Sequence, residues 1–115
     1  MKIQKTEYVP LPMGEYSAIV SDVTAETGQF GPQVKFRFEL TQKNFEGKTL
    51  LGWCSATYSP KSKLWVWAKA MLGTNPAEFD SDQVIGRQVR LAVLARLGED
   101  GQVHNKVDGL LPMPF

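Results

Sequence analysis

The stretch QVKFRFEL, residues 33–40, alternates apolar and charged side chains with a period of two. Every even-numbered residue from 34 to 40 is apolar, whereas Lys35, Arg37 and Glu39 lie between them. Because successive side chains of a β-strand point to opposite faces, this period predicts a strand with one face in a core and the other in solvent. Lys35 and Arg37 are therefore expected on an exposed face, where they either are merely solvated or bind a ligand.

The composition of the 115-residue chain is typical of one globular domain, with 43% hydrophobic and 22% charged residues. We expect a single domain over residues 1–115, with residues 1–13 as an N-terminal arm and residues 111–115 as a short C-terminal tail. The N-terminus lacks the apolar segment of a secretion signal, and no stretch approaches the length of about 18 apolar residues that a membrane span needs. These features predict a cytoplasmic protein that does not cross a membrane.

The sequence contains no recognisable catalytic or metal-binding motif. Cys54 is the only cysteine and there is a single histidine, which excludes a disulfide framework and a Cys/His zinc site. The acidic residues Glu78, Asp80 and Asp82 lack the ligand spacing of a calcium loop. No serine has the context of a catalytic triad. We therefore expect no enzymatic activity, no metal and no cofactor.

Positive charge is concentrated in the middle of the chain. The net charge of the whole chain is only +1, which argues against a strongly basic protein that coats nucleic acid. Residues 33–63, however, contain six lysine and arginine residues against two glutamates, which gives this segment a net charge of +4. The strand that carries Lys35 and Arg37 lies within this basic segment.

Three strands are predicted in the first half of the chain. Residues 14–24 are rich in β-branched and aromatic side chains, and the glycines and proline of residues 26–32 predict a loop after them. The strand at QVKFRFEL is followed by a hairpin turn at residues 44–48, with Gly47 in the left-handed conformation, and by a third strand at residues 49–58. Consecutive strands of this kind predict an antiparallel meander.

A helical pattern follows the third strand. Ser59 is expected as the N-cap, Pro60 as the first helical residue and Gly73 as the C-terminal stop. The predicted buried face of this helix consists of Leu64, Trp67, Ala68 and Met71. The period of two then returns in residues 86–95 and 102–111, which predict a fourth and a fifth strand.

The predicted order of elements is strand, strand, strand, helix, strand, strand. A lone helix between the third and fourth of five strands is the arrangement of the OB-fold, a small Greek-key barrel in which the helix closes one end. We therefore expect an all-β fold with one helix and an OB-fold-like, five-stranded barrel. An SH3-like barrel or a small sandwich is the alternative, although neither normally needs a helix of this length at this position.

Several motifs spread over the chain are similar to those of a known group of proteins. They are GEYSAIVSDV, QVKFRFEL, YSPKSKL before a tryptophan-bearing helix, LGTNPAEFD, IGRQVRLAV and HNKV, within residues 14–112. In these motifs the chain resembles small phage and prophage OB-like proteins. The resemblance implies an OB-like fold, binding of single-stranded DNA, and a role beside replication or recombination proteins.

The expected fold indicates where a ligand would bind. OB-folds bind ligands on strands 2 and 3, between the loop joining strands 1 and 2 and the loop joining strands 4 and 5. Single-stranded nucleic acid requires cations for its phosphates and aromatic planes for its bases. Lys35, Arg37 and Lys48 are the candidate cations in this region. Trp53 and Phe30 are the candidate aromatic planes.

The register of the third strand decides whether Trp53 belongs to this surface. In one register Gly52, Cys54 and Ala56 point inward against the helix. Trp53 then points outward, level with the basic residues. In the opposite register Trp53 is part of the core, because a slip by one residue exchanges the two faces of a strand. Phe30 likewise has an alternative role as an anchor of its loop.

Weaker candidates lie on other elements. Arg96 and Lys106, in the hairpin of the fourth and fifth strands, would extend the basic surface. On the helix, Lys61, Trp65 and Lys69 follow one another at intervals of four residues and form a stripe beside the predicted buried face. Trp65 is expected either to contact a partner or to lie flat beneath the lysine side chains.

Two functions are left open by these candidates. The first is a non-catalytic protein that binds single-stranded DNA, or RNA, through the face of strands 2 and 3. The alternative is a protein-interaction or structural module that uses Trp65, Phe115 or an edge strand to bind a partner or a second copy of the chain. The final Pro-Phe resembles the end of bacterial single-stranded-DNA-binding tails, but those tails are long and acidic, so we expect Phe115 to pack on the barrel or on another subunit. The near-zero net charge favours the alternative.

Overall fold

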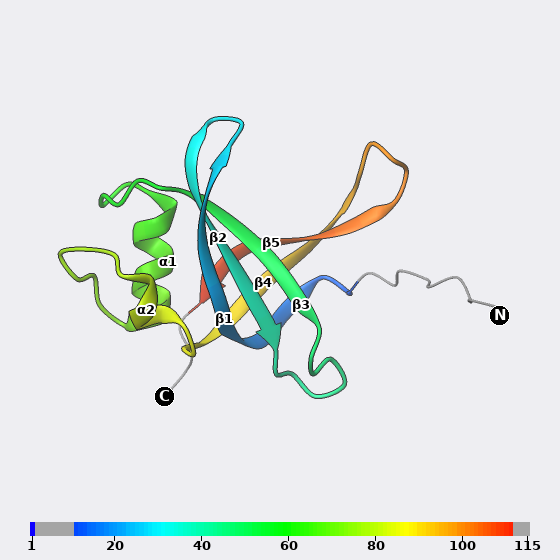
Figure 1. Cartoon of the computed structure of the whole chain (residues 1–115). Coiled ribbons are helices and arrows are strands. Elements are labelled where there is room, and N and C mark those ends of the chain that lie inside the picture. The colour runs from blue at the N-terminus through cyan, green and yellow to red at the C-terminus, as the bar shows by residue number, and fades with distance from the viewer. Residues whose placement is uncertain (2–10, 112–115) are drawn as a thin grey trace.

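The computed structural model describes Met1 and residues 11–111, and these residues form a β-rich fold with one main helix (Figure 1). In chain order the elements are β1 (Gly14–Gly28), β2 (Gly31–Leu40), β3 (Thr49–Ser55), α1 (Lys63–Leu72), α2 (Ser81–Val84), β4 (Gln88–Leu97) and β5 (Val103–Leu111). The helix α1 lies between the third and fourth strands, as the sequence predicts. The short helix α2 is not predicted from the sequence.

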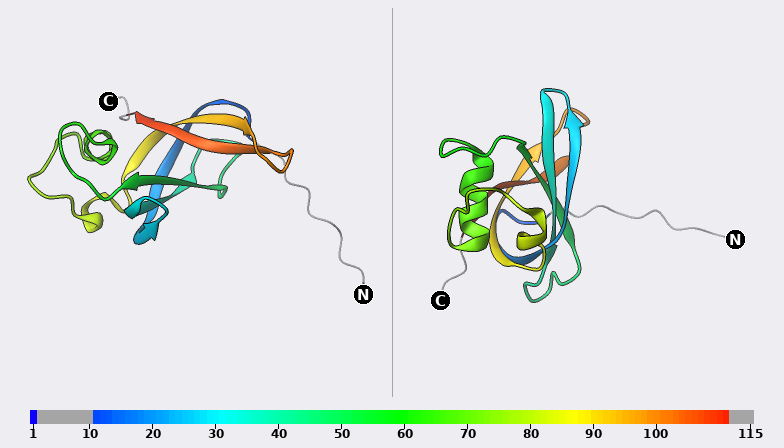
Figure 2. Two further views of the ribbon diagram at one scale, coloured as in Figure 1. Left: turned by 90° about the horizontal axis from the view of Figure 1, so that it is seen from above. Right: turned by 60° about the vertical axis from the view of Figure 1, so that its left-hand side comes forward.

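All five strands belong to one antiparallel sheet with the order β3-β2-β1-β4-β5. The central strand β1 pairs with β4 through residues 14–19, and a β-bulge between Val20 and Asp22 lies where this pairing ends. The sheet is curved so that its two edge strands, β3 and β5, come into contact (Figure 2). No hydrogen-bonded ladder joins them in the described part of the chain. The predicted all-β fold is therefore confirmed, whereas closure into a barrel is not.

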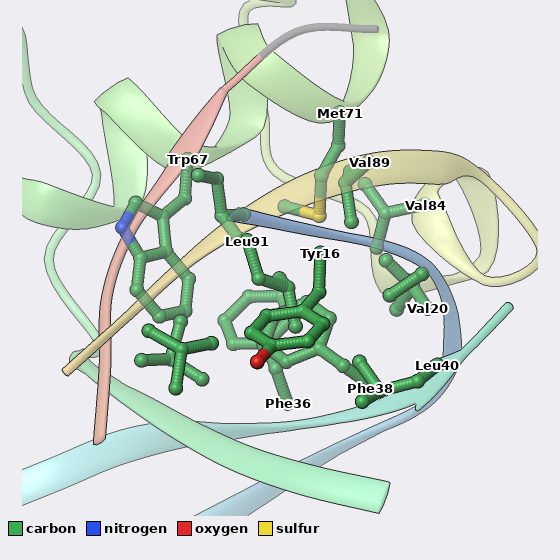
Figure 3. Packing of buried hydrophobic residues seen from close by; sticks show 14 of the residues in the cluster. Tyr16, Val20, Phe36, Phe38, Leu40, Trp67, Met71, Val84, Val89 and Leu91 are labelled. Atoms are coloured by element: carbon green, nitrogen blue, oxygen red, sulfur yellow. The ribbon is translucent and has the colours of Figure 1, made fainter. Parts of the chain in front are cut away.

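Apolar side chains fill the inner face of the curved sheet, which α1 covers at one end (Figure 3). Phe36 and Phe38 of β2 are fully buried, as the alternation in residues 33–40 predicts. Trp67 of α1 packs on both rings, with its centroid 5.4 Å from that of Phe36 and 5.9 Å from that of Phe38. Such aromatic pairs stabilise a core beyond the burial of their surface. This contact fixes the inward face of β2 and leaves Lys35 and Arg37 on the outside.

The helix α1 begins later in the chain than predicted. Its N-cap is Ser62, whose hydroxyl accepts a hydrogen bond from the Trp65 backbone N–H at 3.2 Å. Ser59, the predicted cap, lies in the preceding turn, and both serines are suitable caps by residue type. The predicted stop is confirmed, because Gly73 has a left-handed φ of 79° and its N–H donates to the Lys69 carbonyl. The buried face is also as predicted and consists of Leu64, Trp67, Ala68 and Met71.

The hairpin of β1 and β2 is longer than predicted. The loop expected over residues 26–32 is instead paired strand as far as Gly28 and Gly31. Only Gln29 and Phe30 turn the chain between them. The glycines therefore flank the tight turn itself, and Gly31 has a positive φ of 113°.

The register of β3 places Trp53 on the outer face, with 42% of its surface exposed. Gly52 and Cys54 are buried and point inward. Ala56, which the sequence predicts to point inward, is exposed because β3 ends before it. Inward placement of Gly52 leaves room for Trp67, since a Cβ atom at Gly52 would lie 2.7 Å from the edge of that ring.

Leu11 belongs to the folded part of the chain, although the sequence predicts it within an N-terminal arm. Its side chain is buried, its N–H donates to Asn105 Oδ1 at 2.8 Å, and its carbonyl accepts from Asn105 Nδ2 at 2.9 Å. Residues 2–10 of the predicted arm lie outside the described residues. Phe115 and most of the predicted C-terminal tail also lie outside them, and Leu111 is the last residue of β5.

Gly52→Ala is expected to destabilise the fold by about 1 to 3 kcal/mol, because the added methyl group overlaps the Trp67 ring in a packed core. Gly109→Ala is the matched control, since a Cβ atom at this other strand glycine meets no atom within 4 Å. Urea denaturation followed by tryptophan fluorescence measures both variants. Equal stability of the two would contradict the tight contact between Gly52 and Trp67.

Candidate nucleic-acid interface

The outer face of β1, β2 and β3 brings together basic and aromatic side chains. Lys35 on β2 lies opposite Trp53 on β3. Arg37, the next outward residue of β2, lies opposite Leu51 on β3 and Asp22 on β1. Residues that face each other in an antiparallel pair have Cβ atoms about 4.5 to 5.5 Å apart. The Lys35 side chain and the Trp53 indole therefore lie next to each other on an exposed surface.

Glu26 of β1 connects the polar groups of this face. Its Oε1 atom accepts a hydrogen bond from Trp53 Nε1 at 2.7 Å and another from Gln33 Nε2. Its Oε2 atom lies 3.8 Å from Lys35 Nζ, which forms a half-exposed ion pair. Glu26 thereby fixes the orientation of the indole and offsets part of the positive charge of Lys35.

Neither Glu26 nor Gln33 was predicted as a site residue. Residues 26–32, which include Glu26, were expected to form a loop, and Gln33 was expected only as the first residue of the second strand. The sequence does contain a signal for them. Asp22, Thr24 and Glu26 continue the polar alternation on β1, with apolar residues between them. Extending the first strand through this alternation would have placed Glu26 beside the predicted site.

Three further predicted residues lie on the hairpins formed by β1, β2 and β3, namely Arg37, Lys48 and Phe30. Arg37 is exposed and forms no ion pair with any residue in the described part of the chain. Lys48 is exposed in the turn between β2 and β3. Phe30, at the tip of the β1–β2 hairpin, is 96% exposed, so its alternative role as a packed loop anchor is wrong.

Arg96 and Lys106 lie together on the β4–β5 hairpin, apart from Lys35. Arg96 is opposite His104, and Lys106 is the next outward residue of β5. In the sheet, β1 separates this hairpin from β2, and Figure 1 shows the β1–β2 and β4–β5 hairpins as two separate arms. The predicted basic surface is therefore divided between two arms.

The tip of the β4–β5 hairpin also carries a hydrogen-bonded carboxylate, that of Asp100. His104 Nε2 lies 2.9 Å from Asp100 Oδ2. A hydrogen bond from the Gln102 backbone N–H, together with the His104 side chain, holds the pKa of Asp100 below its ordinary value. The carboxylate is thus charged at neutral pH, and it reduces the positive potential contributed by Arg96 and Lys106.

The stripe predicted on the helix does not form, because Lys61 precedes the start of α1. Trp65 is half-buried and packs on Tyr58, with ring centroids 4.8 Å apart. Tyr58 in turn donates a hydrogen bond to the Pro76 carbonyl at 2.7 Å. Trp65 therefore packs on Tyr58, which precedes α1, and its carbonyl accepts a hydrogen bond from Asn75 Nδ2, which follows α1.

A pocket of about 420 Å³ opens between the end of β3 and the first turn of α1. Its lining residues are Gln33, Trp53, Cys54, Ser55, Ser62 and Lys63. Lys63 Nζ donates to the Trp53 carbonyl at 2.9 Å and lies 4.6 Å from the centroid of the Trp67 ring. Burial raises the pKa of Cys54 to about 12, so this thiol stays protonated and forms part of the wall. The pocket was not predicted, because only the fold brings the start of α1 beside β3.

The described residues contain neither a cluster of metal ligands nor a membrane-spanning helix. His, Cys, Asp and Glu side chains nowhere gather in groups of three that could hold a metal ion. None of the helices there has the length and apolar character needed to cross a membrane.

Comparison of the chain with models of protein families and with curated proteins gives no match. Its function is therefore inferred from the face that carries Lys35, Arg37 and Trp53.

Proposed function

We propose that this protein is a non-catalytic single-stranded-DNA-binding protein with an OB-fold-like barrel. The observation that carries the proposal is the register of β2 and β3, which places Lys35 beside Trp53 on an exposed face, with Arg37 one position further along β2. The strand order and the position of α1 between β3 and β4 support an OB-like topology, in which β3 and β5 are the strands that approach each other.

The chemistry of the outer face suits a flexible, unpaired strand. Lysine and arginine side chains attract phosphates whatever the base sequence. An exposed indole stacks on any base, because every base presents a flat π-face. The face ends at the edge strand β3, so a chain of nucleotides can extend past it. A role beside replication or recombination proteins in a phage-like system is part of the same proposal.

A protein-interaction module remains the second candidate. It is favoured by Leu51 and Trp53, two large apolar side chains that are each 42% exposed on the edge strand β3. Exposed edges of this kind bind added strands or second copies of a chain. Light scattering at several protein concentrations, with and without oligothymidine, distinguishes self-association from binding of the nucleic acid.

Replacing Lys35 and Arg37 together by alanine is expected to weaken binding of oligothymidine and to flatten the dependence of log K on log salt by about 1.4 units. Each lost contact to a single strand removes about 0.7 of that slope. The free energy of unfolding should change little, because surface substitutions usually cost less than about 0.5 kcal/mol. Fluorescence titration at several salt concentrations measures both affinity and slope.

The matched control for this double variant is Lys61→Ala with Lys69→Ala, which removes two exposed lysines away from the face. This control should keep both the affinity and the slope. If the two double variants lose the same affinity, the binding is a general effect of charge and Lys35 and Arg37 are merely solvated.

Trp53→Ala is expected to reduce the affinity for single-stranded DNA by about 1 to 3 kcal/mol, the contribution of one stacked base, and to leave the salt slope unchanged. Trp53→Phe keeps an aromatic plane and should restore most of the affinity. Isothermal titration calorimetry at two salt concentrations measures all three proteins. A loss shared equally by the alanine and phenylalanine variants would point to the hydrogen bond with Glu26 instead of stacking.

Glu26→Gln is expected to strengthen binding by about 0.2 to 1 kcal/mol, the usual contribution of an exposed ion pair, because it releases Lys35 from that pair to contact phosphate. The glutamine oxygen still accepts the hydrogen bond from Trp53. The gain should disappear when Lys35 is already alanine, so a double-mutant cycle of the binding free energies isolates the effect. Glu46→Gln, in the turn before β3, is the control, and an equal gain there would contradict a specific role of Glu26.

A further inference from the structure

The pocket between β3 and α1 combines a cation, a hydroxyl group and an aromatic wall. Lys63 is its only charged lining residue, and none of its lining residues is acidic. Its volume of about 420 Å³ lies in the range of about 300 to 1,000 Å³ found for small-molecule sites. The lining therefore favours a ligand that is both planar and anionic.

Lys63 is held in place but retains capacity to bind. An ammonium group has three N–H donors. One of them is used by the Trp53 carbonyl, and another side of the group faces the Trp67 ring. The Ser55 hydroxyl, at the end of β3, forms no hydrogen bond with any other residue of the described chain. Lys63 and Ser55 can therefore both donate to one anionic group.

Trp53 links this pocket to the outer face. Trp53 is one of the lining residues of the pocket and also lies opposite Lys35 in the β2–β3 register. The hydrogen bond that Trp53 Nε1 donates to Glu26 fixes the orientation of the indole ring. A strand of nucleotides that passes Lys35 along the face reaches the mouth of the pocket at Trp53.

We infer that this pocket binds one nucleotide, with its base against Trp53 and its phosphate at Lys63 and Ser55. In the intact complex this nucleotide is a unit of the bound single strand, so the inference deepens the proposed function and rests on it. The ligand class is a deoxynucleoside monophosphate, either within a strand or free. Lys63 is thus a specific phosphate ligand, beyond the general attraction of the basic face.

Titration of the ¹⁵N-labelled full chain with dTMP, followed by amide chemical shifts, tests the pocket directly. The amides of Ser55, Ser62 and Lys63 should shift in a saturable manner. Oligothymidine should shift the same amides and, in addition, those of Lys35 and Arg37. If dTMP shifts no amide of the pocket, the inference is overturned, even when oligothymidine binds to the outer face and the proposed function stands. If dTMP shifts the pocket and oligothymidine does not bind, the pocket is supported as a mononucleotide site and the proposed function fails.

A variant test gives a second, independent readout. Lys63→Ala should weaken oligothymidine binding about tenfold, the effect of one lost charge-assisted hydrogen bond, and lower the salt slope by about 0.7. Lys63→Arg should retain most of the affinity. Lys61→Ala removes a neighbouring exposed lysine that does not line the pocket and should change neither quantity. Equal losses in the variants at Lys61 and Lys63 would overturn a specific site at Lys63.

Discussion

The packing of Trp67 against Phe36, Phe38 and the bare backbone of Gly52 is the contact on which the rest of the structure depends. A tryptophan ring can lie this close to β3 only where the strand has no side chain. The same ring covers two phenylalanines on β2, so one residue of the helix determines the inward face of two strands. Large buried aromatic residues dominate the energetics of a core of this size.

The outer face follows from this constraint, because alternate residues of a strand must point away from the core. With Phe36 and Phe38 inside, Lys35 and Arg37 are outside, and with Gly52 inside, Trp53 is outside. The proposed ligand-binding surface is thus produced by the packing of the opposite side of the sheet. Glu26 and Asp100 lie beside these cations and offset part of their positive charge, in keeping with the small net charge of the chain.

Local patterns in the sequence predicted which strands and helices form better than they predicted the residues at which these elements begin and end. The alternation of residues 33–40 and the apolar spacing of α1 reflect which side chains are buried. A repeating pattern of apolar residues in the sequence therefore predicts both elements directly. The choice between Ser59 and Ser62 as N-cap depends on where the helix meets the core, and two equivalent serines carry no local information about it. Closure of the sheet depends on contacts between β3 and β5, which are far apart in the chain.

The candidate site was predictable only in part, for the same reason. Lys35, Arg37 and Trp53 lie on consecutive strands joined by a hairpin connection over residues 41–48, so their proximity could be inferred. Predicting the role of Glu26 required the correct length of β1, and predicting that of Lys63 required the position of α1 relative to β3.

The β-bulge between Val20 and Asp22 has a mechanical consequence for both arms. It marks the corner at which β1 leaves β4 while remaining paired to β2, so bending there changes the distance between the two hairpins without breaking either ladder. The sheet thus has two paired parts, β1 with β4 and β1 with β2, and the angle between them at this corner sets how far apart the two hairpins lie.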